Sequence, residues 1–152
     1  AIATPGLYTM LAVALAEAGR LAEARAIARS VDPGPRDYRW LYTQCWLLLT
    51  TARLGDAERL AELRDQLLPY RHMACAVSVH VVSGSVAYFT GEAALALNDV
   101  DAALDDLAMA VQADEAMGAL PWLDRARDAL ARAQRVKALA AVRPSYSDST
   151  QE

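Results

Sequence analysis

Hydrophobic residues recur every three or four positions along most of the chain, a spacing that predicts amphipathic helices. Between residues 8 and 31 two short helices are expected to meet at Gly19, because glycine suits the left-handed conformation that ends a helix. Residues 32–37 contain two prolines and a glycine, cannot continue a helix, and so close this pair. The two apolar stripes consist of Leu11, Leu15 and Ala18, and of Leu21, Ala24, Ile27 (or Ala28) and Val31.

A second pair follows the same plan. A long and strongly apolar helix is expected from about residue 36 to Gly55. Asp56 is then the expected N-cap of a shorter helix, which Pro69 ends because proline has no backbone N–H. The apolar face of the shorter helix consists of Ala57, Leu60, Ala61, Leu67 and Leu68.

Residues 70–82 give an ambiguous pattern. Val77, Val79 and Val81 alternate with other residues as they would in a strand. A single strand here would have no partner elsewhere in a helical chain. We therefore expect a loop around residues 69–72 and a helix that resumes by residues 83–85 and continues to about residue 97.

The third pair ends with a helix from about residue 99 to residue 117, which is acidic on its outer side. Gly118 is expected to end it, and Pro121 suits the first turn of a terminal helix, where its missing N–H costs nothing. The apolar stripe is Val100, Leu104, Leu107 and Val111, with Asp101, Asp105, Asp106 and Glu115 outside it. Residues 1–136 are expected to form the domain, and residues 137–152 a largely disordered tail.

The turns expected near residues 19, 55 and 98 reveal an internal repeat. They are separated by 36 and 43 residues, and paired antiparallel helices with a period near 34 are typical of tetratricopeptide-like repeats. Neighbouring pairs in such repeats bury each other's apolar faces. We predict an all-α fold, a tetratricopeptide-like α-solenoid of about three helix pairs plus a terminal helix.

Composition and charge narrow the function. The chain is 55 % hydrophobic and 22 % charged, which is typical of a soluble globular protein. Its net charge of −4 and the lack of a dense Lys/Arg patch argue against direct nucleic-acid binding by this segment. It holds no run of about 18 apolar residues, so no membrane span is expected. It begins at Ala1 without a leader-like segment, and we interpret it as a piece of a longer cytoplasmic protein.

Candidate chemistry is sparse. The chain has no motif typical of phosphate-binding loops, serine hydrolases or zinc proteases. His72, His80 and Cys75 do not fit a zinc spacing. The acidic group at residues 99–106 lacks the glycine and bidentate glutamate of a calcium loop, and it suits the start of an exposed helix. We expect no catalytic residue, no metal and no cofactor; an enzyme would require an ordered metal or cofactor.

The two cysteines, Cys45 and Cys75, lie in apolar surroundings. We expect two buried free thiols, with one long-range disulfide as the alternative.

Five aromatic residues are the candidate binding residues: Tyr38, Tyr42, Trp46, Tyr88 and Phe89. Two interpretations remain open for them. They line a groove that holds a partner, or they pack between repeats, as the large aromatics of such repeats do.

Three short motifs resemble one family. They are the "G-x-V-x-x-x-x-G" segment from Gly84 to Gly91, "ALND" at residues 96–99 followed by Ala102 and Ala103, and "MGALPWL" at residues 117–123. They resemble the last repeats of the helical C-terminal region in large actinobacterial ATP-binding regulators of the LuxR type and their AfsR/SARP-type relatives. The likeness extends over roughly residues 5–135, with Asn98 in place of the usual glycine.

This resemblance implies a non-catalytic domain of a transcriptional regulator that binds proteins or senses an effector. Its partners would be a protein or peptide, the flanking domains of the same chain, or a small effector. The ATPase and the DNA-binding helix-turn-helix of that family would lie outside this segment. The alternative is a free-standing helical-repeat scaffold for partner docking or oligomerisation, including assembly with copies of itself.

Overall fold

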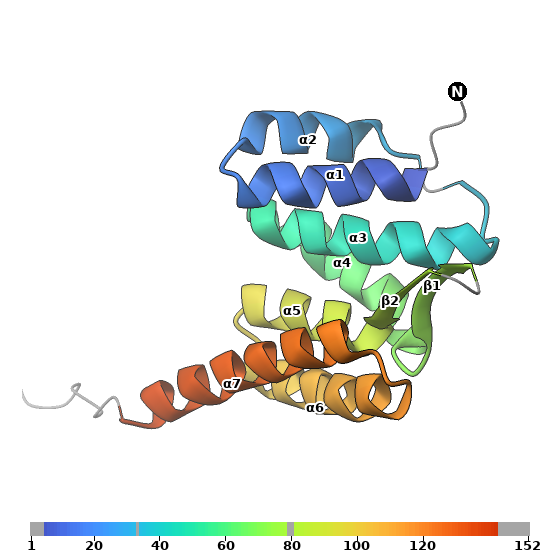
Figure 1. The fold of residues 1–152 in the computed structure, drawn as a ribbon. Coiled ribbons are helices and arrows are strands. Elements are labelled where there is room, and N and C mark those ends of the chain that lie inside the picture. Colours follow the sequence, from blue (N-terminus) through green and yellow to red (C-terminus); the bar gives the residue numbers. More distant parts are fainter. Residues whose placement is uncertain (1–4, 33, 79–80, 143–152) are drawn as a thin grey trace, which may run out of the picture.

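The computed structural model describes residues 5–32, 34–78 and 81–142, and it arranges most of them as stacked helices (Figure 1). In Figure 1 the first helices of the three pairs, α1, α3 and α5, follow one another down the molecule, and α7 lies at the far end. The described part is therefore mostly helical, as predicted. The helices are α1 (Pro5–Glu17), α2 (Leu21–Ser30), α3 (Tyr38–Leu54), α4 (Ala57–Leu67), α5 (Val86–Ala96), α6 (Val100–Ala116) and α7 (Leu120–Val142).

The predicted turns are confirmed. Gly19, Gly55, Asn98 and Gly118 all have positive φ angles, between 61° and 78°, in the left-handed region that ends a helix. The expected cap of α4 is also present, because the Asp56 carboxylate accepts a hydrogen bond from the backbone N–H of Arg59 at 3.2 Å.

The rejection of a strand within residues 70–82 is wrong. After a short 3₁₀ turn, η1 (Leu68–Tyr70), the chain forms an antiparallel hairpin of β1 (Ala74–Ser78) and β2 (Val81–Ser85). Strand β1 therefore finds its partner in the residues that directly follow it, so no strand from elsewhere in the chain is needed. Helix α5 begins only at Val86.

The terminal helix is longer than predicted. The expected domain end at residue 136 falls inside α7, which continues to Val142 and projects beyond the other helices (Figure 1). Lys137 of this extension forms an ion pair with Asp101 of α6 at 2.7 Å. None of the described helices combines the length and apolar character needed to cross a bilayer.

The two glycines of the first resemblance motif allow close approaches between elements. A Cβ atom on Gly91 of α5 would lie 2.6 Å from the side chain of Leu107 on α6. A Cβ atom on Gly84 of β2 would lie 2.9 Å from Trp122 of α7, and Gly84 also has a φ of +70°. Both glycines of the resemblance motif therefore serve packing.

Both cysteines are free and buried, as predicted. Cys45 lies in α3 and Cys75 in β1, which packs against α3. Burial raises the pKa of the Cys75 thiol well above its usual value, and the neighbouring Cys45 adds to this shift. Both thiols are therefore shielded from solvent, and that of Cys75 also stays protonated.

We expect Gly91→Ala to destabilise the protein by about 1–3 kcal/mol, because the added methyl group overpacks against Leu107. In an exposed helix the same change would stabilise the protein by about 0.5–1 kcal/mol. The contact with Leu107 therefore reverses the sign of the change in unfolding free energy. Urea unfolding measures the difference. The control is Gly91→Ala in a Leu107→Ala background, where most of the steric cost should be lost because only the backbone contact with residue 107 remains. Equal costs in both backgrounds would contradict this account.

We expect neither thiol to react rapidly with Ellman's reagent in the native protein, and both to react in denaturant. Thiolate is the reactive form, and burial suppresses it. Fast labelling of the native protein would show that the hairpin opens readily. If fewer than two thiols per chain react in denaturant without reductant, the two cysteines have formed a disulfide.

Candidate binding groove between α3, α5 and α7

Four of the five predicted aromatics lie in the core. Tyr42, Trp46, Tyr88 and Phe89 are all at most 7 % exposed. Tyr38 is the first residue of α3, and its side chain lies outside the described part. In this conformation the four buried rings occupy packing positions between helix pairs and present little surface to a partner.

Trp122 of α7 completes this aromatic cluster and was missed as a member from the sequence. Its ring lies 5.9 Å from that of Trp46 and 5.6 Å from that of Tyr88, in edge-to-face geometry. Trp46 also meets Phe89 at 5.7 Å. The cluster therefore joins α3, α5 and α7. In the sequence, the only local sign that Trp122 would be buried is its place as the first large apolar residue after Pro121.

Tyr42 also lines a small recess of about 220 Å³ between α1, α3 and the hairpin. Its hydroxyl donates a hydrogen bond to the Met10 sulfur at 3.0 Å. Leu7 and Val77 contribute apolar walls.

A ladder of alternating charges crosses four helices. Arg53 of α3 lies 3.9 Å from Glu17 of α1 and 3.3 Å from Glu92 of α5. Arg132 of α7 contacts the second carboxylate oxygen of Glu92. Glu92 is buried, so its charge requires these two guanidiniums as partners. Burial, and then the negative charge of Glu92, raise the pKa of the adjacent Tyr88 hydroxyl.

A groove of about 470 Å³ opens beside this ladder, between α3, α5 and α7. We name it the α7 groove. Arg53, Arg132 and Arg135 supply its positive charge; Glu92 is its carboxylate, and its apolar wall consists of Leu95, Ala96, Val136 and Leu139.

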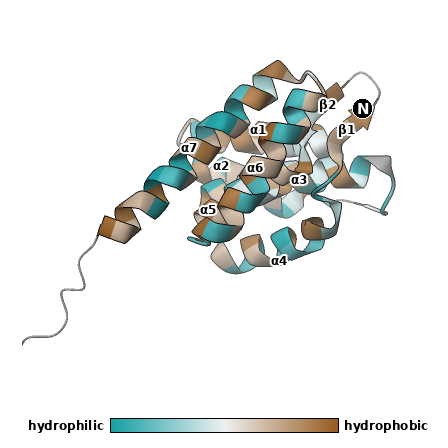
Figure 2. Ribbon diagram, turned by 90° about the horizontal axis from the view of Figure 1, so that it is seen from below, coloured by the Kyte–Doolittle hydropathy of each residue, from teal (hydrophilic) through white to brown (hydrophobic). Residues whose placement is uncertain are grey.

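The projecting end of α7 forms the most open wall of this groove. Leu139 is 69 % exposed, and no described residue covers the apolar side of this end. Figure 2 shows hydrophobic and hydrophilic residues alternating along α7 as far as its tip. An uncovered apolar wall beside guanidiniums suits a peptide that carries both apolar and acidic side chains.

Asp106 corrects the expectation of a fully solvated acidic face on α6. Its carboxylate is buried and receives hydrogen bonds from Arg64 at 3.1 Å and from Arg71 at 3.2 Å. Arg64 also donates to the backbone carbonyl of Thr90 at 3.2 Å. The clamp joins α4 and the residue after η1 to α5 and α6, and its charges are mutually satisfied.

Asp114 is a second buried carboxylate on α6, and it lacks such partners. In the part of the chain that the structure describes, neither of its oxygens accepts a well-formed hydrogen bond. Burial raises the pKa of Asp114, and the nearby backbone N–H and hydroxyl of Ser85 offset only part of that shift. Its ionisation at neutral pH therefore opposes folding.

The residues considered for a metal do not converge. His72 is exposed whereas Cys75 is buried, and His80 lies outside the described residues. Within residues 5–32, 34–78 and 81–142 no three potential ligands gather.

Comparisons of the chain with protein-family models, with curated proteins and with solved structures find no match. The groove and its charges therefore carry the functional argument.

We expect Asp114→Asn to raise the melting temperature at pH 7, because the amide removes the cost of a buried charge. The raised pKa means that the contribution of Asp114 to stability is present in full below its unfolded pKa of about 4 and is lost as the pH rises through the folded pKa. The advantage of the variant should therefore shrink as the pH falls to about 4. Melting curves across this range provide the test, with exposed Asp105→Asn as the control. An Asp114→Asn protein that is less stable at pH 7 would contradict it.

Proposed function

We propose that this chain is a tetratricopeptide-like solenoid and serves as a non-catalytic interaction domain, with a protein or peptide segment held in the α7 groove. The observation that carries the proposal is the uncovered apolar wall of α7 beside the guanidiniums of Arg53, Arg132 and Arg135. Such a wall costs solvation free energy until a partner covers it.

The solenoid interpretation has two supports. Each helix pair is joined by a short turn with a left-handed residue at position 19, 55 or 98. The pairs also follow one another in a single direction through the molecule (Figure 1). Helices α1, α3 and α5 would then form one surface, and the charge ladder runs across it to α7.

The regulatory role rests on the family resemblance. We propose that the chain is part of a cytoplasmic transcriptional regulator and that a ligand in the α7 groove biases the attached domains. Such a ligand can shift an equilibrium only as far as its affinities for the two states differ.

Self-association is the second candidate function. Leu7 and Leu11 of α1 are exposed at one end of the stack, and Leu139 and Val142 are exposed at the other. Two such surfaces on one chain allow copies to assemble head to tail. Sedimentation of wild-type protein and of Leu139→Asp distinguishes this candidate, because only an α7-mediated oligomer would dissociate on that change.

The groove is tested with a displayed peptide library selected on the wild-type protein. We expect the selected peptides to lose affinity by about tenfold or more on Leu139→Asp, because anchor residues in apolar sites carry much of the binding energy. Leu120→Asp is the matched control, since Leu120 is equally exposed at the opposite end of the same helix. Peptides that bind both variants equally would place the site elsewhere and overturn the groove assignment.

The regulatory part has a separate test in the reading frame that encodes this chain. We expect a nucleotide-binding motif and a helix-turn-helix in the same frame. A frame with neither would contradict the regulatory role and leave the peptide-binding result untouched.

A further inference from the structure

A second groove, of about 300 Å³, lies on the opposite side of α3, between α2 and α4. We name it the α2–α4 groove. Its floor is largely apolar and comes from Ala28, Leu47, Thr51 and Leu54. Arg25 and Arg29 of α2 and Arg59 of α4 also line it.

The guanidiniums of this groove are poorly neutralised. Arg25 donates to the backbone carbonyl of Leu54 at 3.5 Å and has no carboxylate partner in the described residues. Arg29 likewise forms no ion pair within the part of the chain that the structure describes. Arg59 pairs with Glu62 at 2.9 Å, where both side chains are about half exposed and the pair is weak.

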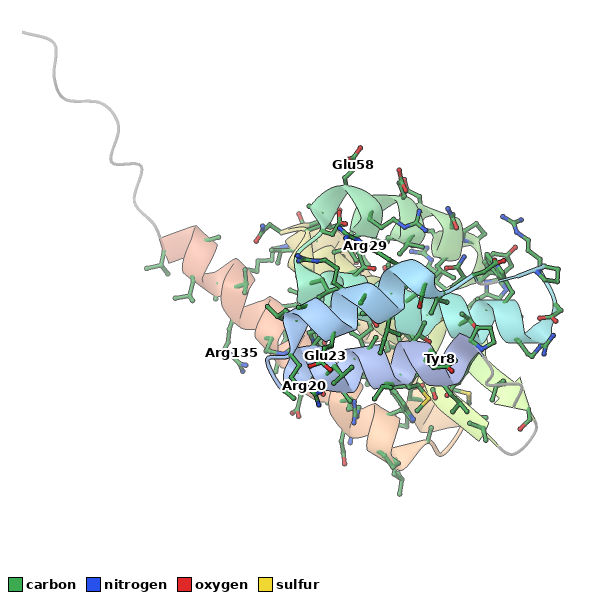
Figure 3. The ribbon with its side chains drawn as sticks, turned by 90° about the horizontal axis from the view of Figure 1, so that it is seen from above. Tyr8, Arg20, Glu23, Arg29, Glu58 and Arg135 are labelled. Carbon is green, nitrogen blue, oxygen red and sulfur yellow. The ribbon has the colours of Figure 1, made fainter. Side chains whose placement is uncertain are left out.

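The lining offers little negative charge in return. Asp56 is its carboxylate, and it already accepts the backbone N–H of Arg59 as the cap of α4. Figure 3 shows Arg29 on the side of α2 that faces α4, whereas Glu58 points outward from α4. Several like charges thus converge on one groove in a chain whose net charge is −4.

The other clustered arginines of the fold behave differently. Arg64 and Arg71 bind Asp106, and Arg53 and Arg132 bind Glu92, so those guanidiniums satisfy buried carboxylates. In the α2–α4 groove no buried carboxylate is available for the same purpose. An anionic ligand would remove the repulsion between the guanidiniums and gain charge-assisted hydrogen bonds.

We propose that the α2–α4 groove binds an acidic peptide segment. Aspartate or glutamate side chains of the segment pair with Arg25, Arg29 and Arg59, and an apolar side chain between them covers Ala28 and Leu54. The planar guanidinium matches a carboxylate in bidentate geometry. The apolar floor favours a peptide over a free phosphate, which would gain nothing from it. This proposal does not depend on the occupant of the α7 groove.

The probe is a fluorescein-labelled peptide of alternating glutamate and leucine, titrated with the protein and followed by fluorescence anisotropy. We expect Arg29→Glu and Arg25→Glu each to weaken binding by about tenfold or more, because each replaces an attraction by a repulsion. Arg20→Glu is the matched control. It changes the net charge equally and lies at the start of α2, where Arg20 pairs with Glu23 outside the groove.

A second variant separates a shaped site from general charge attraction. Ala28→Leu fills the floor without changing the charge, and we expect it to weaken binding as well. Arg29→Gln removes the positive charge without adding a negative one, and we expect it to weaken binding less than Arg29→Glu. Circular dichroism checks that every variant folds. Because the probe also has the chemistry that suits the α7 groove, each titration is repeated in a Leu139→Asp background, so failure of either groove assignment is distinguishable from failure of the other.

Four results would overturn the proposal. Arg20→Glu could weaken binding as much as Arg29→Glu, which would show that only net charge matters. Ala28→Leu could have no effect, or an all-glutamate peptide could bind equally well, which would remove the apolar floor from recognition. Inorganic pyrophosphate could displace the peptide at an equal concentration, which would make the groove a small-anion site.

Discussion

The stacking of the helices depends on one buried charge, the carboxylate of Glu92. It sits in the interior of α5 and is held by Arg53 from α3 and Arg132 from α7, so both of its oxygens have partners only when all three helices are in place. Removing a partner from a fully buried pair costs about 3–5 kcal/mol, and somewhat less here because both guanidiniums remain partly exposed. The pair between Arg132 and Glu92 also links α7 to α5 beside the groove that Val136 and Leu139 line.

Close packing at one glycine of α5 and one of β2 supports the same arrangement. Gly91 admits Leu107, and Gly84 admits Trp122, whose ring then reaches Trp46 and Tyr88. These contacts need a residue without a side chain at positions 84 and 91 and a large ring at position 122. Gly84, Gly91 and Trp122 therefore explain in physical terms how closely these elements pack.

Arginine has two distinct roles in this fold. Within the stack it neutralises buried carboxylates and fixes neighbouring pairs against each other, as Arg64 does with Asp106. At the two grooves Arg29 and Arg135 form no ion pair within the described residues and lie beside apolar surface, and both binding proposals rest on this arrangement. A chain with a negative net charge can therefore still attract acidic segments at particular sites, since charges interact mainly within about 10 Å at ordinary salt.

The sequence by itself determined where most of the helices lie, the turns between them and the cap of α4, because these depend on residues within one or two turns of each other. Gly19, Gly55 and Asn98 marked the ends of helices correctly for that reason. Only the tertiary structure decided which polar groups are buried. Asp106 and Glu92 lie in the interior because arginines from other helices cover them, and periodicity along one helix does not reveal its neighbours. Contacts between segments also bury four of the aromatic residues in the core. Pairing between two neighbouring segments, residues 74–78 and 81–85, forms the hairpin.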